Sequence, residues 1–429
     1  MIEGVSVQTR LGQPPRPFRA SATRTLNGER LALGATAGAV ALLPLLSPSG
    51  PANLAPVDLL IAAAVAACLL WAGTAGHQWR FPYALPMAVF ITGGALGALV
   101  GPVPGAGTLA IVQDLWVLVW CWAVANVAKS PARLKVLLMT WAYSSIAWAM
   151  LLFAGIITGS TLLTGRTARE GSRTALTFID PNVAANYYVV SIMIIWAIQR
   201  PRRRVFRFAA YALFVAAIVS SGSNSGIVSL IVGTSVAAIV GVYRRLGGVA
   251  AITTLCFLLL AGFIAASTIS IQGIQERAHT SRYAFIRDGI GRGETSVAQR
   301  DTLLHESVPL YEHGGLLGQG PVSTKPRLQK EMAPFVKEAH DDYAAALIER
   351  GLIGLIGLLL LVFTLATGAV ALAGSQLTKG FAAVVQKPHA LVGALVGTMA
   401  AMTVYELLHV RHVWTLFAFV GALYIWGRE

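Results

Sequence analysis

Long apolar runs, separated by short polar links, dominate the chain. The runs lie near residues 31–48, 55–73, 83–101, 108–128, 134–158, 183–199, 205–220, 225–243, 249–271, 343–372, 388–406 and 411–427. A helix needs about 20 apolar residues to cross the hydrocarbon core of a bilayer, and each run has roughly that length. The stretch RPRRRVFR at 200–207 separates two runs, because so many guanidinium groups must lie at a membrane surface. The pattern predicts an all-α, polytopic integral membrane protein with about 12 transmembrane helices.

One link, residues 272–342 between the ninth and tenth runs, is much longer than the others. Links longer than about 15 residues are uncommon unless they are functional or disordered. The stretch AQRDTLLHESVPLY at 298–311 has apolar residues three to four positions apart, which indicates an amphipathic helix. We therefore expect a large, partly helical loop that carries site residues. The expected division is a flexible cytoplasmic tail at 1–30, helices one to nine at 31–271, the loop at 272–342 and helices ten to twelve at 343–429.

Lys and Arg residues lie in alternate links. More than half of the 33 basic residues fall in the first 30 residues, at the C-terminal end and in every second link. The intervening links at 47–56, 101–107 and 221–226 contain none. Because short cytoplasmic loops are enriched in Lys and Arg, this distribution predicts that both termini are cytoplasmic and that the 272–342 loop is extracytoplasmic.

The composition also indicates a membrane protein. Only 12% of residues are charged and 55% are hydrophobic, whereas a soluble domain carries about 25% charged residues. A net charge of +14 would suggest a nucleic-acid partner in a soluble protein, but here it follows from the basic links, so no nucleic acid is expected. Cys68, Cys121 and Cys256 all lie inside apolar runs and predict neither a disulfide framework nor a metal site.

Arginines crowd the predicted outer loops, against the trend of the other links. The loop at 159–182 contains Arg166, Arg169 and Arg173, and the long loop contributes Arg287, Arg292 and Arg300. Any one of them fits ordinary solvation or contact with lipid headgroups equally well. Together they fit a clamp on an anionic ligand, because guanidinium groups match phosphate oxygens in a bidentate way and stay charged.

His340 opens the sequence HDDYAAALIERGLIG at the outer end of the tenth run. A lone His is more often structural than catalytic, but Asp341 and Asp342 follow it, and a carboxylate orients an imidazole and raises its basicity. A metal site is the alternative, although no third ligand lies at helical spacing, so no metal or cofactor is expected. Glu406, His409 and Arg411 in the last outer link either pair among themselves or join the site.

The cytoplasmic links lack a nucleotide-binding phosphate loop. Chemistry is therefore expected outside the cell, where nucleotide sugars are absent. A group transfer there requires a donor that is already activated, and a lipid-linked diphosphate is such a donor.

Three segments, in order, resemble the motifs of one family. RTALTFIDPN at 173–182 resembles its "R…G.F.(N/D)PN" signature, RDTLLHESVPLYEHGGLLGQGP at 300–321 its second motif, and HDDYAAALIERGLIG at 340–354 its "HN.YL….E.GL.G". The family is the O-antigen ligase and polymerase superfamily of bacterial membrane glycosyltransferases. The chain departs from it at Asn224 in SGSNSG, where many members carry Arg, and at Leu304, where they carry Trp. Arg169 or Arg292 would then substitute for the missing guanidinium.

The resemblance implies a metal-independent, inverting glycosyltransferase of the GT-C kind in the bacterial cytoplasmic membrane. It would move a glycan from an undecaprenyl-diphosphate carrier to a lipid or glycan acceptor hydroxyl on the extracytoplasmic face. By position, Arg173 and Arg300 would bind the diphosphate and His340 would activate the acceptor. The residues expected to bind diphosphate or glycan are Arg169, Arg292, Asn182, Asn224 and Asp342.

Two other activities stay open. A polymerase of the same superfamily would join carrier-linked repeat units and would use the same motifs. A transporter or flippase for lipid-linked glycans is a different class, typified by internal repeats, broken helices and charges at mid-membrane depth. The two halves of the chain show no clear repeat and mid-span charges are sparse, which favours the enzyme.

Overall fold

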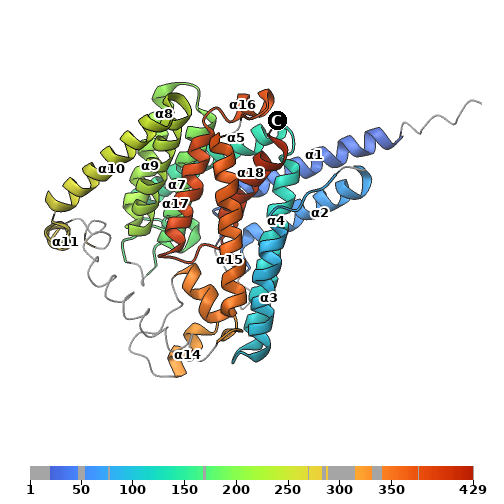
Figure 1. Cartoon of the computed structure of the whole chain (residues 1–429), viewed down its shortest axis with the longest axis horizontal. Helices are drawn as coiled ribbons and strands as arrows, with labels where there is room; N and C mark the ends of the chain where they lie inside the picture. The colour runs from blue at the N-terminus through green and yellow to red at the C-terminus, as the bar shows by residue number, and fades with distance from the viewer. Residues whose placement is uncertain are drawn as a thin grey trace, which may run out of the picture.

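The structure is a computed structural model. It describes residues 20–46, 54–75, 78–167, 171–268, 270–282, 287, 315–330, 341–374 and 376–428. In this part of the chain the regular elements are helices, with a single isolated β-bridge between Leu377 and Arg428 (Figure 1). The all-α fold class is thus confirmed for the described residues.

Every predicted run overlaps a helix. These helices are α1 (Ala20–Ala41), α2 (Pro56–Ala75), α3 (Ala84–Val100), α4 (Pro104–Val127), α5 (Pro131–Thr158), α7 (Pro181–Ile198), α8 (Arg204–Ser221), α9 (Asn224–Leu246), α10 (Gly248–Thr268), α15 (Asp342–Gly374), α17 (Pro388–Met402) and α18 (Arg411–Trp426). The short elements are α6 (Thr161–Thr164), the 3₁₀ turn η1 (Leu176–Phe178), α11 (Ile271–His279), α14 (Thr324–Lys330) and α16 (Lys379–Val384). Helix α1 begins within the expected tail, and residues 1–19 lie outside the described part.

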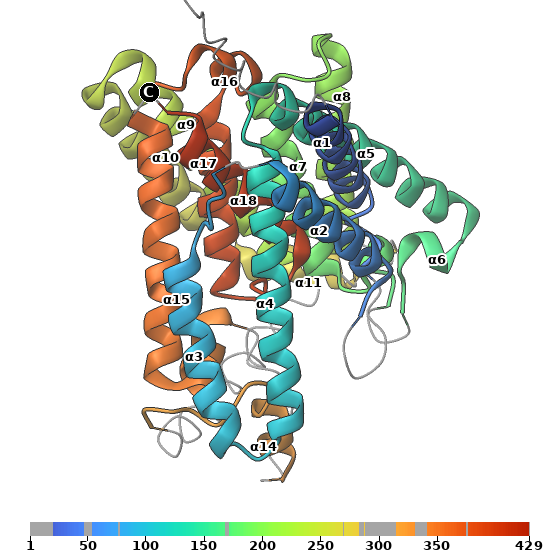
Figure 2. The same ribbon diagram turned by 90° about the vertical axis from the view of Figure 1, so that its right-hand side faces the viewer.

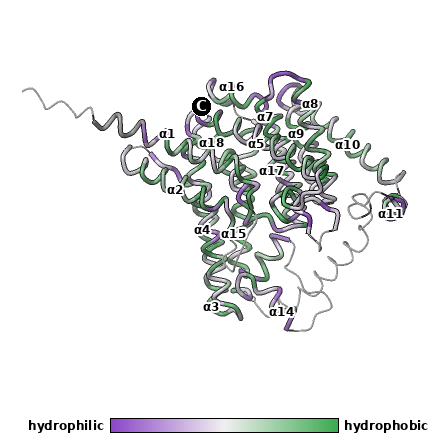
Figure 3. Tube along the Cα trace, turned by 180° about the vertical axis from the view of Figure 1, so that it is seen from behind, coloured by the Kyte–Doolittle hydropathy of each residue, from purple (hydrophilic) through white to green (hydrophobic). Residues whose placement is uncertain are grey.

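Eight helices of the described part are long and apolar enough to cross a membrane. They are α2, α4, α5, α7, α8, α9, α10 and α15, and α3 and α17 are apolar but shorter. The prediction of a polytopic membrane protein is therefore confirmed, whereas the count of twelve spans stays a prediction. Figure 3 shows hydrophobic residues along the bundle helices and hydrophilic ones at the turn that leads into α8.

Apolar side chains cover the outside of the bundle as well as its interior. Along α10, Ile252, Phe257 and Phe263 are 64%, 68% and 71% exposed. Such a surface would be unfavourable in water and is suited to lipid. At the centre, α7 is buried along almost its whole length among α5, α8, α9 and α17. Helix α7, which follows its N-cap residue Asp180, is therefore the most enclosed of the eight long apolar helices described. This enclosure fixes its ends in place.

Helices α3, α4 and α15 run side by side toward α14 at one end of the molecule, and α16 and the C-terminus lie at the other (Figures 1 and 2). Small residues allow the close approach of α3 to α15, since a Cβ at Gly93 would collide with the backbone of Gly354. Asp114 of α4 pairs with Arg350 of α15 at 2.7 Å, and the guanidinium lies over the ring of Phe90. The Asp114 carboxylate is thus paired inside the bundle.

The links between helices gather at two ends, as alternating spans require. Basic residues at one end contact the ends of neighbouring helices: Lys387 N donates to Ala197 O in the last turn of α7 at 2.9 Å, and Arg244 Nη1 donates to Ala373 O in the last turn of α15 at 3.2 Å. The loop at 159–182 contacts the end of α8, where Thr174 N donates to Ser220 O at 3.1 Å. The predicted orientation of these two ends relative to the membrane stays a prediction.

Candidate functional site at the end of the bundle opposite the basic links

Arg173 is buried, with 6% of its surface exposed, although it lies in a link between α6 and η1. Its Nε donates to Ser221 O at 2.8 Å, and its Nη2 lies 3.4 Å from Asn182 Oδ1. The last carbonyls of a helix have no partner within the helix and carry partial negative charge, so the guanidinium caps the end of α8. The Thr174 and Ser220 hydroxyls, 2.8 Å apart, hold the link against the same helix end.

The sequence Asp180-Pro181-Asn182 forms the start of α7. Asp180 is the N-cap residue, and its Oδ1 accepts the N–H groups of Asn182 at 2.7 Å and Val183 at 3.3 Å. Pro181 follows at the first helical position, where its fixed φ angle suits the helix and its missing N–H costs nothing. These two residues place the Asn182 side chain at the helix tip, facing Arg173.

Asn182 also joins α7 to the start of α9. Its Oδ1 accepts the hydroxyl of Ser223 at 2.8 Å and lies 3.4 Å from the hydroxyl of Ser225. Ser223 is in turn the N-cap of α9 and accepts the N–H of Gly226 at 3.1 Å. We call Arg173, Asn182, Ser223 and Ser225 the Arg173 cluster. It gathers groups from three segments between the N-termini of two helices.

The link at residues 403–410, between α17 and α18, contacts two neighbouring segments. The hydroxyl of Tyr405 donates to the carboxylate of Asp180. The carboxylate of Asp342, the first residue of α15, accepts the N–H groups of Leu407 at 2.7 Å and Leu408 at 3.2 Å. Because Asp342 follows His340 by two residues, this link ties the chain next to the predicted general base to the N-terminus of α7.

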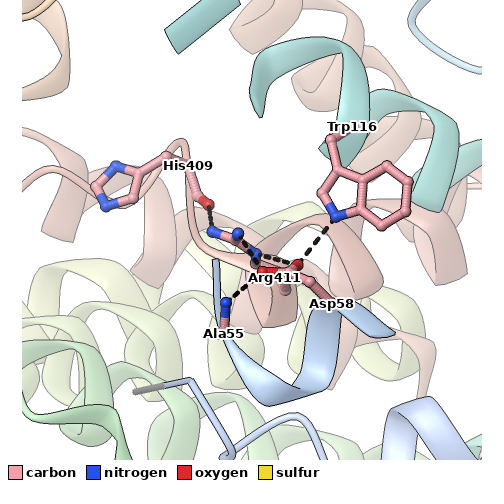
Figure 4. Close-up of polar contacts among 5 residues, drawn as sticks. All are labelled: Ala55, Asp58, Trp116, His409 and Arg411. Atoms are coloured by element: carbon pink, nitrogen blue, oxygen red, sulfur yellow. Dashed lines mark hydrogen bonds and ion pairs between the residues drawn. The ribbon is translucent and has the colours of Figure 1, made fainter. Parts of the chain in front are cut away.

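Asp58 and Arg411 form a buried ion pair beside that link, each with 4% of its side chain exposed (Figure 4). Arg411 donates from Nη2 and Nε to the two Asp58 oxygens at 2.8 and 3.0 Å. Asp58 also accepts Trp116 Nε1 and the Ala55 N–H, both at 2.9 Å. Asp58 lies in the first turn of α2, and its pairing with Arg411 places its carboxylate inside the protein. Arg411 contacts His409 through the backbone carbonyl, at 3.2 Å.

Residues 315–324, a described segment in the second half of the long loop, pack on a break in α15. Gly351 has φ 64° and ψ −167°, which interrupts the helix and leaves carbonyls for other donors. Gln319 N donates to Ile348 O and Gly320 N to Glu349 O, both at 2.8 Å. The described residues of the glycine-rich segment begin with a turn at residues 315–317.

The carboxylate of Glu349 holds the end of the same segment. It accepts the Thr324 hydroxyl at 2.7 Å and the Val322 N–H at 2.8 Å. Sequence reasoning missed this residue as a contact, although it is the acidic position in the third motif.

Residues 209–359 match the family model described as O-antigen ligase. The matched segment runs from α8 to the middle of α15 and covers about a third of the chain. It supports the O-antigen ligase and polymerase superfamily, and the resemblance seen in the motifs is confirmed over this segment. No curated protein matches the chain. The family indicates a membrane protein of polysaccharide biosynthesis with ligase-like or polymerase-like glycosyl transfer.

The O-antigen ligase segment contains most of the predicted site residues. The structure brings Arg173 and Asn182 into contact, although both precede the matched segment. Asn224, within it, is exposed on the first turn of α9. Asp342 directs its carboxylate at backbone N–H groups of the 403–410 link. The four other predicted residues lie outside the described part of the chain: Arg169, Arg292, Arg300 and His340.

Asp341, the residue after His340, is the N-terminal anchor of α15. Its Oδ1 accepts the N–H groups of Tyr343 at 2.7 Å and Ala344 at 3.1 Å. Burial raises the pKa of this carboxyl group above its ordinary value of 3.8, and the two N–H groups oppose that shift. The flanking carboxylates of the HDD sequence therefore both have backbone partners in the described structure.

Proposed function

We propose that this protein transfers a glycan from an undecaprenyl-diphosphate carrier to an acceptor hydroxyl at the extracytoplasmic membrane face. In this proposal it is an inverting, metal-independent glycosyltransferase of the O-antigen ligase kind. The observation that carries the proposal is the Arg173 cluster, which joins a buried guanidinium to the starts of α7 and α9. The family match over residues 209–359 supports the same activity.

The electrostatics of the cluster suit a diphosphate. Helix N-termini carry partial positive charge, and two of them, of α7 and α9, flank Arg173. The Ser221 carbonyl and the Asn182 amide oxygen accept hydrogen bonds from Arg173 and orient its guanidinium.

We assign the chemical roles as follows. Arg173 and Arg300 bind the diphosphate, and Arg169, Arg292, Asn182 and Asn224 contribute to binding the diphosphate or the glycan. His340 takes the proton of the acceptor hydroxyl as its oxygen attacks the anomeric carbon. The bond from that carbon to the diphosphate oxygen breaks on the opposite face, and its electron pair leaves with the diphosphate. Fixed cations stabilise that developing charge more effectively than water does.

The orientation of the site follows from the distribution of basic links. Those links meet at the end opposite the Arg173 cluster, and short cytoplasmic loops are enriched in Lys and Arg. We therefore propose that both termini are cytoplasmic, that the chain crosses the bacterial cytoplasmic membrane twelve times, and that the cluster faces outward.

The deciding experiment incubates the purified protein with a lipid-diphosphate oligosaccharide and sizes the products. A single capped product indicates a ligase, a ladder of lengths indicates a polymerase, and transbilayer movement without turnover indicates a transporter. Arg300→Ala and His340→Ala are expected to abolish transfer while expression and folding persist. Arg202→Ala, in the basic link before α8, is the matched control and should keep full activity. Full activity in both site variants would overturn the assignment of Arg300 and His340.

A further inference from the structure

Asp58 and Arg411 are fixed more completely than a structural ion pair requires. The two Asp58 oxygens accept four hydrogen bonds, from Arg411 twice, from Trp116 and from Ala55. The pair thereby joins the starts of α2 and α18 to α4. Because the pair is buried and has a fixed hydrogen-bond geometry, it also fixes the position of the segments that are bonded to it.

The 403–410 link is attached directly to this pair. Arg411 Nη1 donates to His409 O at 3.2 Å, and Trp414 Nε1 donates to Leu408 O. The next two contacts along the link are those of Leu407 and Leu408 with Asp342 and of Tyr405 with Asp180. The link is therefore bonded to residues of α18 at its C-terminal end. Its other contacts are with the starts of α15 and α7.

We propose that the Asp58–Arg411 pair is a positioning device that sets the 403–410 link and, through it, the starts of α15 and α7. This inference rests on the proposed function, because those helix starts adjoin His340 and the Arg173 cluster. Neither Asp58 nor Arg411 contacts substrate in this proposal. They act through Asp342, which is two residues from His340, and through Asp180, which caps the helix that carries Asn182.

Comparing the stability of single and double variants distinguishes a positioning role of the pair from a purely stabilising one. Burying two charges is costly, and replacing both partners of a buried pair with apolar residues is often neutral or stabilising. Removing one partner leaves an uncompensated charge in the interior and is strongly destabilising. A double apolar variant should therefore fold well but lose the link geometry, because the bonds to His409, Trp116 and Ala55 go with the charges.

The first test measures hydrogen exchange of the peptide that contains residues 403–410. The variants are Asp58→Asn, Arg411→Gln and the double variant Asp58→Leu/Arg411→Met. We expect the Leu407 and Leu408 amides to exchange about tenfold faster in all three, while the double variant recovers the wild-type melting temperature. The control is Glu29→Gln, which removes the ion-pair partner of Arg133, a pair in which Glu29 is partly exposed, and should leave this exchange unchanged.

The second test measures glycan transfer by the double variant at saturating donor. A small misplacement of reacting groups lowers rates steeply, so we expect kcat to fall about 10- to 100-fold in a protein with a normal melting temperature. A double variant with wild-type exchange and wild-type kcat would show that the pair only stabilises, and would overturn the proposal. If the wild-type protein transfers no glycan, the proposed function fails, but the exchange measurement still decides whether the pair holds the link.

Discussion

The carboxylate of Glu349 accepts the hydroxyl hydrogen of Thr324 at 2.7 Å, across 25 residues of chain. Together with the break at Gly351, this contact fastens the end of the long loop to α15. The segment that leads from the loop back to the membrane therefore has a fixed starting point. Glu349 therefore anchors the segment to the helix that begins two residues after His340, the predicted base.

Glu349→Ala is expected to release residues 315–330 from α15. The substitution leaves the Thr324 hydroxyl and the Val322 N–H without their acceptor, and an unsatisfied buried donor costs about 1–3 kcal/mol. Glu349→Gln keeps one carbonyl oxygen and should have a smaller effect. Limited proteolysis and hydrogen exchange of residues 315–330 measure the release. Equal protection in the Ala variant and the wild type would show that Glu349 does not hold this segment.

Hydrophobic periodicity predicted the helices well because it depends on local sequence and on the thickness of a bilayer. Each of the runs overlaps a helix, and even the division at 200–207 agrees with the boundary between α7 and α8. The pairing of Arg173 with Asn182 was also within reach, since they belong to one motif nine residues apart. In both cases the residues that determine the structure lie close together in the sequence.

Contacts between residues that are far apart in the sequence could not be predicted from it. Asp58 and Arg411 are separated by 353 positions, and each has an ordinary local explanation near the end of a run. Tyr405 and Asp180 are 225 positions apart, and nothing in either segment indicates the other. A single sequence fixes which residues lie at the same end of a bundle, but not which helices become neighbours there.

Arg173→Ala is expected to lower kcat/KM for glycan transfer about 100-fold, since one preorganised donor contributes roughly that much to stabilising a developing negative charge. Arg173→Lys should recover only part of the activity, because an ammonium group lacks the fork that contacts Ser221 and Asn182 at once. The measurement is steady-state kinetics with a lipid-diphosphate donor.

Added guanidinium ion tests whether Arg173→Ala loses activity because the guanidinium group is missing or because the protein folds poorly. If the loss is chemical, the ion should restore part of the activity without changing the melting temperature. Wild-type activity in Arg173→Ala without the ion would contradict the proposed role.

Asp341 predicts a pH dependence of stability. Because burial raises its pKa, the folded protein binds the proton more tightly than the unfolded chain does. The contribution is fully present below the unfolded value of 3.8 and is lost as the pH rises through the raised folded value. Asp341→Asn keeps an oxygen for the Tyr343 N–H but does not titrate. Its melting temperature should exceed that of the wild type near neutral pH, and the difference should shrink toward about pH 4. A melting-temperature difference that grows on acidification would show that the pKa of Asp341 is lowered, not raised, in the folded protein.

Asn224→Arg is expected to lower the KM for the lipid-diphosphate donor several-fold while kcat stays near the wild-type value. Asn224 is exposed on the first turn of α9, next to Ser223 of the Arg173 cluster, so a long side chain fits without repacking the interior. A cation there opposes the helix dipole by only about 0.3–1 kcal/mol, whereas a guanidinium on a phosphate forms charge-assisted bonds. Asn224→Ala is the matched control and separates loss of the amide from gain of the charge. An Arg variant with unchanged KM at low and high salt would place the diphosphate away from the start of α9.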